Sequence, residues 1–216
     1  MDDNALIAHF RSHVAEDLQV LALLQERELT QTLLEELRQA HFPDNFGLRL
    51  QGEEACELMR KVMANLPEPI ELPLLDDLAA DFAAIYLNNS FHASPYESVW
   101  LSEEHLTHQE PMFQVRQWYD KYGLVAENWR TRADDHIVLQ LQFLAHLFSL
   151  DDQQETLREA ARFLDEHPLR WVDQFARRVA ARCQTPFYAG LNLFVAQYLK
   201  ELRELLAEIL SVAETQ

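Results

Sequence analysis

The sequence predicts an all-α protein, a multi-helix bundle of roughly nine to eleven helices, and two observations carry this prediction. The chain has 216 residues but only four glycines. Long stretches rich in Leu, Ala, Glu, Gln and Arg place apolar residues at helical spacing, and these residue types favour helix over strand. Because 48% of the residues are hydrophobic, the chain can bury a substantial core.

Three helices are expected in the first third of the chain. Residues 14–26 place apolar side chains at helical spacing, and Thr30 can cap a second helix over QTLLEELRQA. Pro43 and Gly47 then interrupt the chain. A third helix is expected from Glu53 to Leu66, before the proline-rich connector PEPIELP.

The remaining helices follow from periodicity and from breaking residues. One is predicted over residues 74–89, and Pro111 can open another that Gly123 closes. From Asp134 onward, four more helices of roughly 16, 14, 14 and 26 residues are expected. Residues 124–134 are the predicted hinge between two of these helices.

This hinge suggests a larger N-terminal part, residues 1–130, and a smaller C-terminal part, residues 131–216. The two parts can also form one compact domain. A hinge before the last helices makes a domain-swapped dimer a plausible alternative to a monomer.

The charge of the chain restricts its partners. Its 36 acidic and 18 basic residues give a formal net charge of −18, which repels phosphate backbones and anionic lipid headgroups. Nucleic acid is therefore not an expected partner. No apolar run reaches the roughly 18 to 20 residues that span a bilayer, so membrane insertion is not expected either. A cationic peptide fits this charge.

The cysteines and the N-terminal sequence favour the cytoplasm. Cys56 and Cys183 lie far apart and belong to no CxxC pair, which gives no sign of a zinc or redox motif. The chain begins with an acidic segment and lacks the basic and apolar regions of a secretory signal.

The step Asp134-Asp135-His136 has two interpretations. Either aspartate can accept a hydrogen bond from the first amides of the helix that follows, and capping is the commoner role. His136 in a first helical turn should stay neutral, which suits hydrogen bonding either to a ligand or to a neighbouring helix.

Enzymatic motifs are missing from the sequence. His105 and His108 lie three residues apart among Glu103, Glu104 and Glu110, but without the HExxH signature we expect a solvated acidic loop and no metal.

Ser98 has no flanking glycines to form a nucleophile elbow. The glycines at positions 47, 52, 123 and 190 are too scattered for a phosphate loop. We therefore expect a protein that is not an enzyme and carries no cofactor of its own.

Aromatic residues gather between positions 96 and 122, where they can line a groove for an apolar peptide or simply belong to the core. They are Tyr96, Trp100, Trp118, Tyr119 and Tyr122.

Four segments, taken in order, resemble the TorD/DmsD/NarJ family of redox-enzyme maturation chaperones. They are SPYESVWL, WYDKYGL, DDHIVLQLQFLAHL and TPFYAGLNLFVAQYL, and the resemblance covers roughly residues 74–200. In that family the Asp-His step usually closes a Glu-Pro-x-Asp-His pattern. Asp135 and His136 match it, whereas Arg132 and Ala133 depart from it, so a charge is reversed and the backbone before the helix is relaxed.

The resemblance implies an all-helical cytoplasmic chaperone. Such a protein binds the twin-arginine signal peptide, and often the body, of a molybdenum-cofactor oxidoreductase until the client's cofactor is inserted. The implied client-binding residues are Tyr96, Ser98, Trp100, Tyr119, Gly123, Asp135 and His136.

Two alternatives remain. One is a NarJ-like assembly chaperone for the catalytic subunit of a membrane-bound reductase. The other is a helical adaptor that binds guanine nucleotide weakly, although no phosphate loop supports it.

Overall fold

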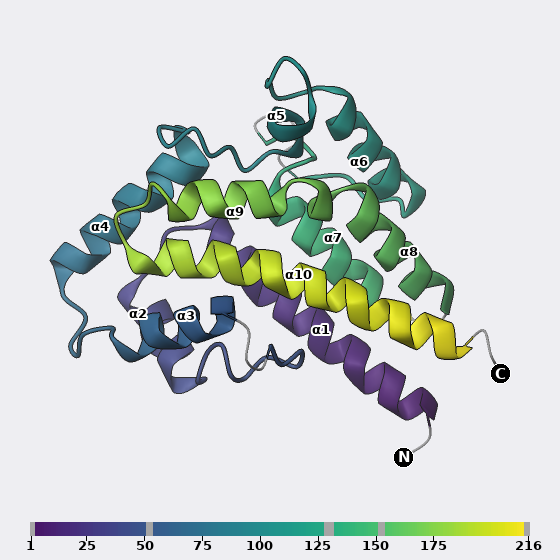
Figure 1. Ribbon diagram of the computed structural model, residues 1–216, viewed down its shortest axis with the longest axis horizontal. Coiled ribbons are helices and arrows are strands. Elements are labelled where there is room, and N and C mark those ends of the chain that lie inside the picture. Colours follow the sequence, from purple (N-terminus) through teal and green to yellow (C-terminus); the bar gives the residue numbers. More distant parts are fainter. Residues whose placement is uncertain (1–2, 51–53, 128–131, 151–153, 214–216) are drawn as a thin grey trace.

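The computed structural model describes residues 3–50, 54–127, 132–150 and 154–213. These residues form ten α-helices, and no strand occurs among them, so the predicted all-α class is confirmed (Figure 1). The helices are α1 (Asp3–Glu26), α2 (Gln31–Gln39), α3 (Glu54–Ala64), α4 (Leu72–Phe82), α5 (Glu97–Leu101), α6 (Glu110–Lys121), α7 (Ile137–Ser149), α8 (Gln154–Glu166), α9 (Val172–Ala180) and α10 (Pro186–Ala213).

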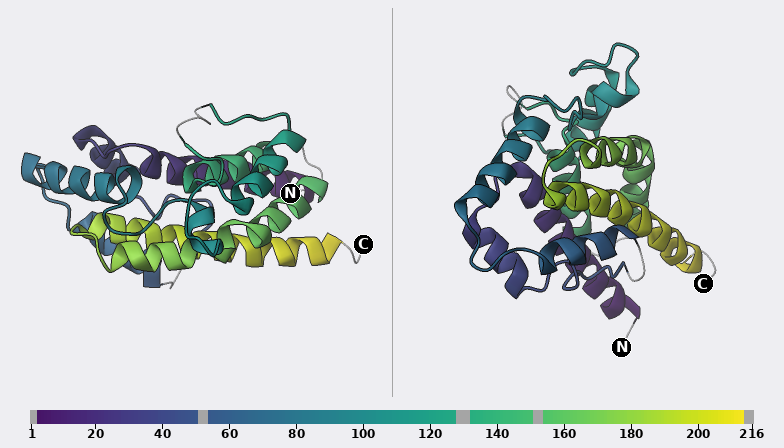
Figure 2. Two further views of the ribbon diagram at one scale, coloured as in Figure 1. Left: turned by 90° about the horizontal axis from the view of Figure 1, so that it is seen from above. Right: turned by 60° about the vertical axis from the view of Figure 1, so that its left-hand side comes forward.

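The helices pack around one continuous hydrophobic cluster whose members extend from Val14 to Leu206. The first helix, α1, packs mainly along α7, whereas α10 packs against α9, α3 and α8. Both views in Figure 2 show α9 and α10 lying alongside each other. The cluster therefore includes side chains from both of the predicted parts, 1–130 and 131–216.

Two buried polar side chains fix α1 to distant segments. The guanidinium of Arg11 donates to the carbonyl oxygens of Leu147 and Leu150, where α7 ends. The carboxylate of Asp17 accepts hydrogen bonds from the Gly47 amide and the Tyr198 hydroxyl. These bonds satisfy backbone groups that helix ends and loops would otherwise leave without partners.

The helix predicted over residues 74–89 differs in detail from the one observed. Regular α4 ends at Phe82, and the chain continues as a π-helical turn over Ala83–Leu87. On this helix Asp81 is buried, and its carboxylate accepts from the amides of Gln184 and Thr185. Asp81 thus holds the segment that leads directly into α10, a role that requires a contact across about half of the chain.

The end of α6 agrees with prediction. Gly123 has a φ of 66°, in the left-handed region that favours glycine. Its amide donates to the carbonyl of Asp120, and the Leu124 amide donates to that of Tyr119. This pair of bonds is the Schellman arrangement that ends many helices.

Some predicted features lie outside the described residues: Gly52, Glu53 and part of the 124–134 hinge, namely residues 128–131. In the ranges that the structure does describe, no helix has both the length and the apolarity needed to cross a membrane.

Candidate functional site

The segment that enters α5 crosses the segment that enters α7. Residues 95–98 and 134–138, here called the crossing, form a short antiparallel pairing between Tyr96 and His136. The Glu97 amide donates to the carbonyl of Asp135 at 3.1 Å, and the Ile137 amide donates to that of Pro95 at 2.9 Å. Two helix starts are thereby held against each other.

Asp135 caps a helix other than the one expected. Its Oδ2 accepts from the Ser98 amide at 2.7 Å, in the first turn of α5, and its side chain is completely buried. Burial raises the pKa of the Asp135 carboxyl above its usual value, and the hydrogen bonds from Ser98 oppose that rise. The capping interpretation therefore applies to α5, 37 residues away in sequence, and not to α7.

His136 is the residue that caps α7. Its Nδ1 accepts from the Val138 amide at 3.2 Å, and the ring packs edge-on against Tyr96 with centroids 4.8 Å apart. Burial lowers the pKa of His136 to about 3, mainly because a charged imidazolium would be desolvated. The expected neutral state of His136 agrees with this geometry, since a capping nitrogen must keep its lone pair.

The expectation that Asp134 starts the helix was wrong. The helix begins at Ile137, and the buried Asp134 carboxylate pairs with Arg116, whose Nη2 lies 2.6 Å from Asp134 Oδ2. The Asp134 carbonyl also accepts from the Tyr119 hydroxyl at 3.0 Å. Because burial raises the pKa of Tyr119 well above its usual value, this hydroxyl keeps its proton and remains a donor. Both contacts attach α6 to the crossing.

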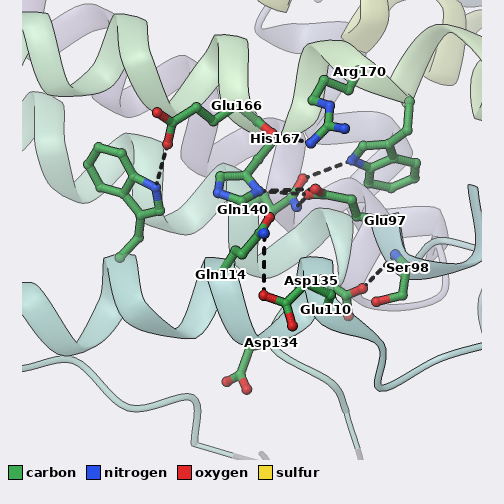
Figure 3. Close-up of polar contacts among 12 residues, drawn as sticks. Glu97, Ser98, Glu110, Gln114, Asp134, Asp135, Gln140, Glu166, His167 and Arg170 are labelled. Atoms are coloured by element: carbon green, nitrogen blue, oxygen red, sulfur yellow. Dashed lines mark hydrogen bonds and ion pairs between the residues drawn. The ribbon is translucent and has the colours of Figure 1, made fainter. Parts of the chain in front are cut away.

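A buried polar network behind the crossing was missed by the sequence reasoning (Figure 3). The fully buried carboxylate of Glu97 lies 3.0 Å from Nδ1 of His167 and accepts from the Gln140 amide group. Gln140 in turn accepts from the Trp171 indole at 3.3 Å. The signal in the sequence was an acidic residue within the otherwise apolar and aromatic stretch PYESVW.

The structure brings five of the seven expected client-binding residues together, and four of these five are buried. They are Tyr96, Ser98, Tyr119, Asp135 and His136, of which only Tyr96 is partly exposed. Trp100 lies farther along α5, half-buried, with its indole donating to the Ser94 carbonyl and Arg178 over its ring. Gly123 is exposed at the end of α6.

Beside the crossing lies an open groove made of two adjoining cavities of about 350 and 220 Å³. Both cavities are lined by Tyr119, Leu124, Val125 and Ala126. The other lining residues are Glu26, Arg116, Asp120, Glu127, Arg132, Asp134, Leu139, Gln142, Phe143 and His146.

The groove combines apolar walls with free negative charge. Its two arginines are already paired, Arg116 with Asp134 and Arg132 with Glu26. Asp120 and Glu127 have no ion-pair partner within the described ranges. Val125, which lines both cavities, is 77% exposed. The groove therefore offers an apolar contact flanked by carboxylates that are available to a cationic ligand.

The histidine cluster between α5 and α6 lies in an exposed loop. His105 and His108 both have positive φ angles, and their Nδ1 atoms lie within hydrogen-bonding distance of the Val99 carbonyl and the Thr107 hydroxyl. Considering only the residues that are described, no group of three or more His, Cys, Asp or Glu side chains is arranged to hold a metal ion.

Comparison with known proteins identifies a family. The family model described as nitrate reductase delta subunit matches residues 52–177. The chaperone protein TorD of Vibrio vulnificus is 30% identical over 56% of this chain, and that of Photobacterium profundum is 28% identical over 87%. The match spans 60% of the first protein and 91% of the second.

A solved structure from Archaeoglobus fulgidus, assigned as a redox enzyme maturation protein, is 17% identical and covers 91% of this chain and 93% of its own. Its TM-score of 0.46 is too low to add to the argument. The family model and the TorD relatives show that the chain belongs to the nitrate reductase delta subunit family, the TorD/DmsD/NarJ group of redox-enzyme maturation chaperones.

Proposed function

We propose that the protein is a cytoplasmic chaperone, and not an enzyme, that binds the twin-arginine signal peptide or the apo form of a molybdenum-cofactor oxidoreductase. In this role it assists cofactor insertion and delays export until the client is complete. Family membership and the chaperone names of the TorD relatives support the general role. The groove supports the choice of a basic and apolar peptide as the ligand.

The observation that carries this proposal is the pairing of an exposed apolar surface with unpaired carboxylates. Twin arginines bind carboxylates through paired hydrogen bonds, and the apolar part of a signal peptide needs a hydrophobic surface. Val125 supplies such a surface, and Asp120 and Glu127 supply the carboxylates. The net charge of −18 adds long-range attraction for a cationic peptide.

The crossing supports the groove from behind. Asp134 lines the groove and is held by Arg116 and Tyr119, while its neighbour Asp135 holds the start of α5. Under this proposal Asp135 and His136 position the wall of the groove, and the peptide contacts the residues of the groove itself.

The test measures peptide affinity by fluorescence anisotropy with a labelled twin-arginine peptide. The double variant Val125→Ser/Glu127→Gln removes one apolar contact and one charge from the groove. We expect binding to weaken roughly tenfold, from about 1 kcal/mol of apolar contact and about 0.5 kcal/mol of charge. A twin-lysine peptide should bind the wild-type protein less tightly, because lysine cannot form paired hydrogen bonds with a carboxylate.

The matched control is Leu72→Ser/Glu103→Gln. Leu72 is 74% exposed, close to the value for Val125, and Glu103 is an exposed acid, but neither residue lines the groove. Equal affinities in the groove variant and the control variant would refute this location for the peptide.

A second candidate is a NarJ-like chaperone for the catalytic subunit of a membrane-bound reductase, which the description of the matching family favours. Such a protein would bind the body of its client and show no measurable affinity for a twin-arginine peptide. Co-purification from the native cell with mass spectrometry separates the two functions, because it identifies the client directly.

A further inference from the structure

Two histidines on α1 face each other at a place that neither the groove nor the crossing includes. His9 and His13 are one helical turn apart, and His13 precedes the groove residue Glu26 by about 20 Å along the helix axis. His9 is exposed and His13 is partly exposed, and both lie in the N-terminal half of α1.

The Nε2 atoms of the two imidazole rings face each other at hydrogen-bonding distance. These atoms are 3.1 Å apart, with ring centroids 4.2 Å apart and the ring planes at 80°. Zinc and related ions bind imidazole nitrogen at about 2.05 Å, so one ion reaching both nitrogens would subtend an angle of about 98°. That angle lies between the roughly 90° of square-planar and the roughly 109° of tetrahedral coordination.

The surroundings of His13 favour the tautomer that a metal ion needs, with the proton on Nδ1. Oε2 of Glu16 lies 3.6 Å from Nδ1 of His13, on the side away from His9. At this distance the carboxylate is too far for a hydrogen bond but attracts a proton to Nδ1, which would leave the Nε2 lone pair available to a metal ion.

The loop that follows α2 also restricts His13. A Cβ added at Gly47 would lie 2.4 Å from the Cβ of His13, so only glycine permits this close approach. The Gly47 amide is anchored to Asp17, one helical turn beyond His13. This contact fixes the backbone and Cβ of His13, from which the imidazole projects.

We propose that His9 and His13 form a two-point surface site for a divalent transition-metal ion that prefers imidazole, such as Ni²⁺, Cu²⁺ or Zn²⁺. Two protein ligands leave coordination positions for water or for a group from another molecule. The site is independent of the peptide groove, and the net charge of −18 on the chain increases the concentration of cations near its surface.

The experiment titrates the full-length protein with Ni²⁺ alone in isothermal titration calorimetry, up to about 100 µM of metal. We expect one ion to bind per chain. His9→Ala and His13→Ala should each weaken binding at least roughly tenfold, because a chelate loses the benefit of its second ligand when either one is removed. Far-UV circular dichroism establishes that both variants remain folded.

The control is His105→Ala/His108→Ala, which removes another closely spaced pair of exposed histidines while leaving α1 intact. This variant should bind Ni²⁺ as the wild-type protein does. The proposal is overturned if the wild-type protein binds no Ni²⁺ in this range, or if either α1 variant keeps wild-type affinity.

Discussion

The crossing and the groove lie side by side, yet they use polar side chains in opposite ways. In the crossing, Asp135 and His136 are buried, and each accepts a hydrogen bond from the backbone of a helix start. In the groove, Asp120 and Glu127 have no cationic partner in the described part of the chain, and Val125 is exposed. The polar side chains of the crossing hold helix starts in place, whereas those of the groove are exposed to a ligand.

The residues that identify the family therefore differ from most of the residues proposed to contact a ligand. The Asp-His step, by which the sequence resembles its family, is enclosed in the protein. Val125 and Glu127, which are exposed in the groove, belong to none of the four segments that carry the family resemblance. A sequence signature can therefore mark the scaffold of a binding site even when some of the contacting residues lie outside the signature.

The largest expected effect concerns the network behind the crossing. Glu97→Ala removes the carboxylate that His167 and Gln140 contact, and it leaves both side chains buried without this partner. We expect the free energy of unfolding, measured by urea titration, to be roughly 3 to 5 kcal/mol lower than that of the wild-type protein. Glu103→Ala, in the exposed loop, is the control. A loss below about 1 kcal/mol would show that the network contributes little to stability.

Acid should destabilise the crossing through His136. An unfolded histidine has a pKa near about 6.5, whereas burial lowers that of His136 to about 3. Between these values the unfolded state binds a proton that the folded state does not, so stability falls as the pH falls. At about pH 4 the loss should be on the order of 3 kcal/mol.

The matched variant for this prediction is His136→Asn, because asparagine can also accept from the Val138 amide but does not titrate. The raised pKa of Asp135 acts in the opposite direction in both proteins, so comparing them isolates His136. Urea unfolding at about pH 4 and about pH 7 measures the effect. Identical pH profiles for the two proteins would contradict the buried neutral cap.

Salt should weaken peptide binding in the groove and should leave the contribution of the crossing to stability unchanged. Between about 0.05 and 0.5 M NaCl, we expect twin-arginine peptide affinity to fall roughly tenfold, since exposed charges are screened. The urea midpoint of Glu97→Ala relative to wild type should change little over the same range, because buried pairs are screened much less. A salt-independent peptide affinity would remove the electrostatic argument for the groove.

The smallest expected effect belongs to Asp135→Asn. Asparagine can still accept from the Ser98 amide, so stability should change by less than about 1 kcal/mol. If the crossing only positions the groove, peptide affinity should also change little. If Asp135 contacts the peptide directly, affinity should fall by roughly 1.5 to 3 kcal/mol in a protein that remains folded. Thermal unfolding and anisotropy on one preparation decide between these roles.

Local signals in the sequence predicted the helices well. The cap at Thr30 and the glycine at position 123 each act within one helical turn. The structure confirms the helix start at Thr30 and the helix end at Gly123. The start of α7 was misplaced because aspartate is the commoner cap, and nothing local shows that Asp135 is engaged by α5. Five-residue α5 is too short for its periodicity to be recognised.

The site was predictable only in part, because its contacts join residues that are far apart in the sequence. The resemblance identified the segments that meet at the crossing, but burial decides whether their side chains face inward or outward. Glu97 and His167 are 70 residues apart in sequence, so no local pattern connects them. The groove depends on how Leu124 and Glu127 lie relative to Glu26 at the end of α1, which only the folded chain specifies.

The packing of α1 has a consequence for biosynthesis. Arg11 bonds to the backbone 136 residues later, and Asp17 bonds to Tyr198, 181 residues later. During synthesis, α1 must therefore wait for α7, which begins about 110 residues after α1 ends, before most of its apolar side can be covered. Until α7 is made, α1 exposes an apolar surface of the kind that chaperones bind, so a protein proposed to bind unfinished enzymes itself passes through an unfinished state.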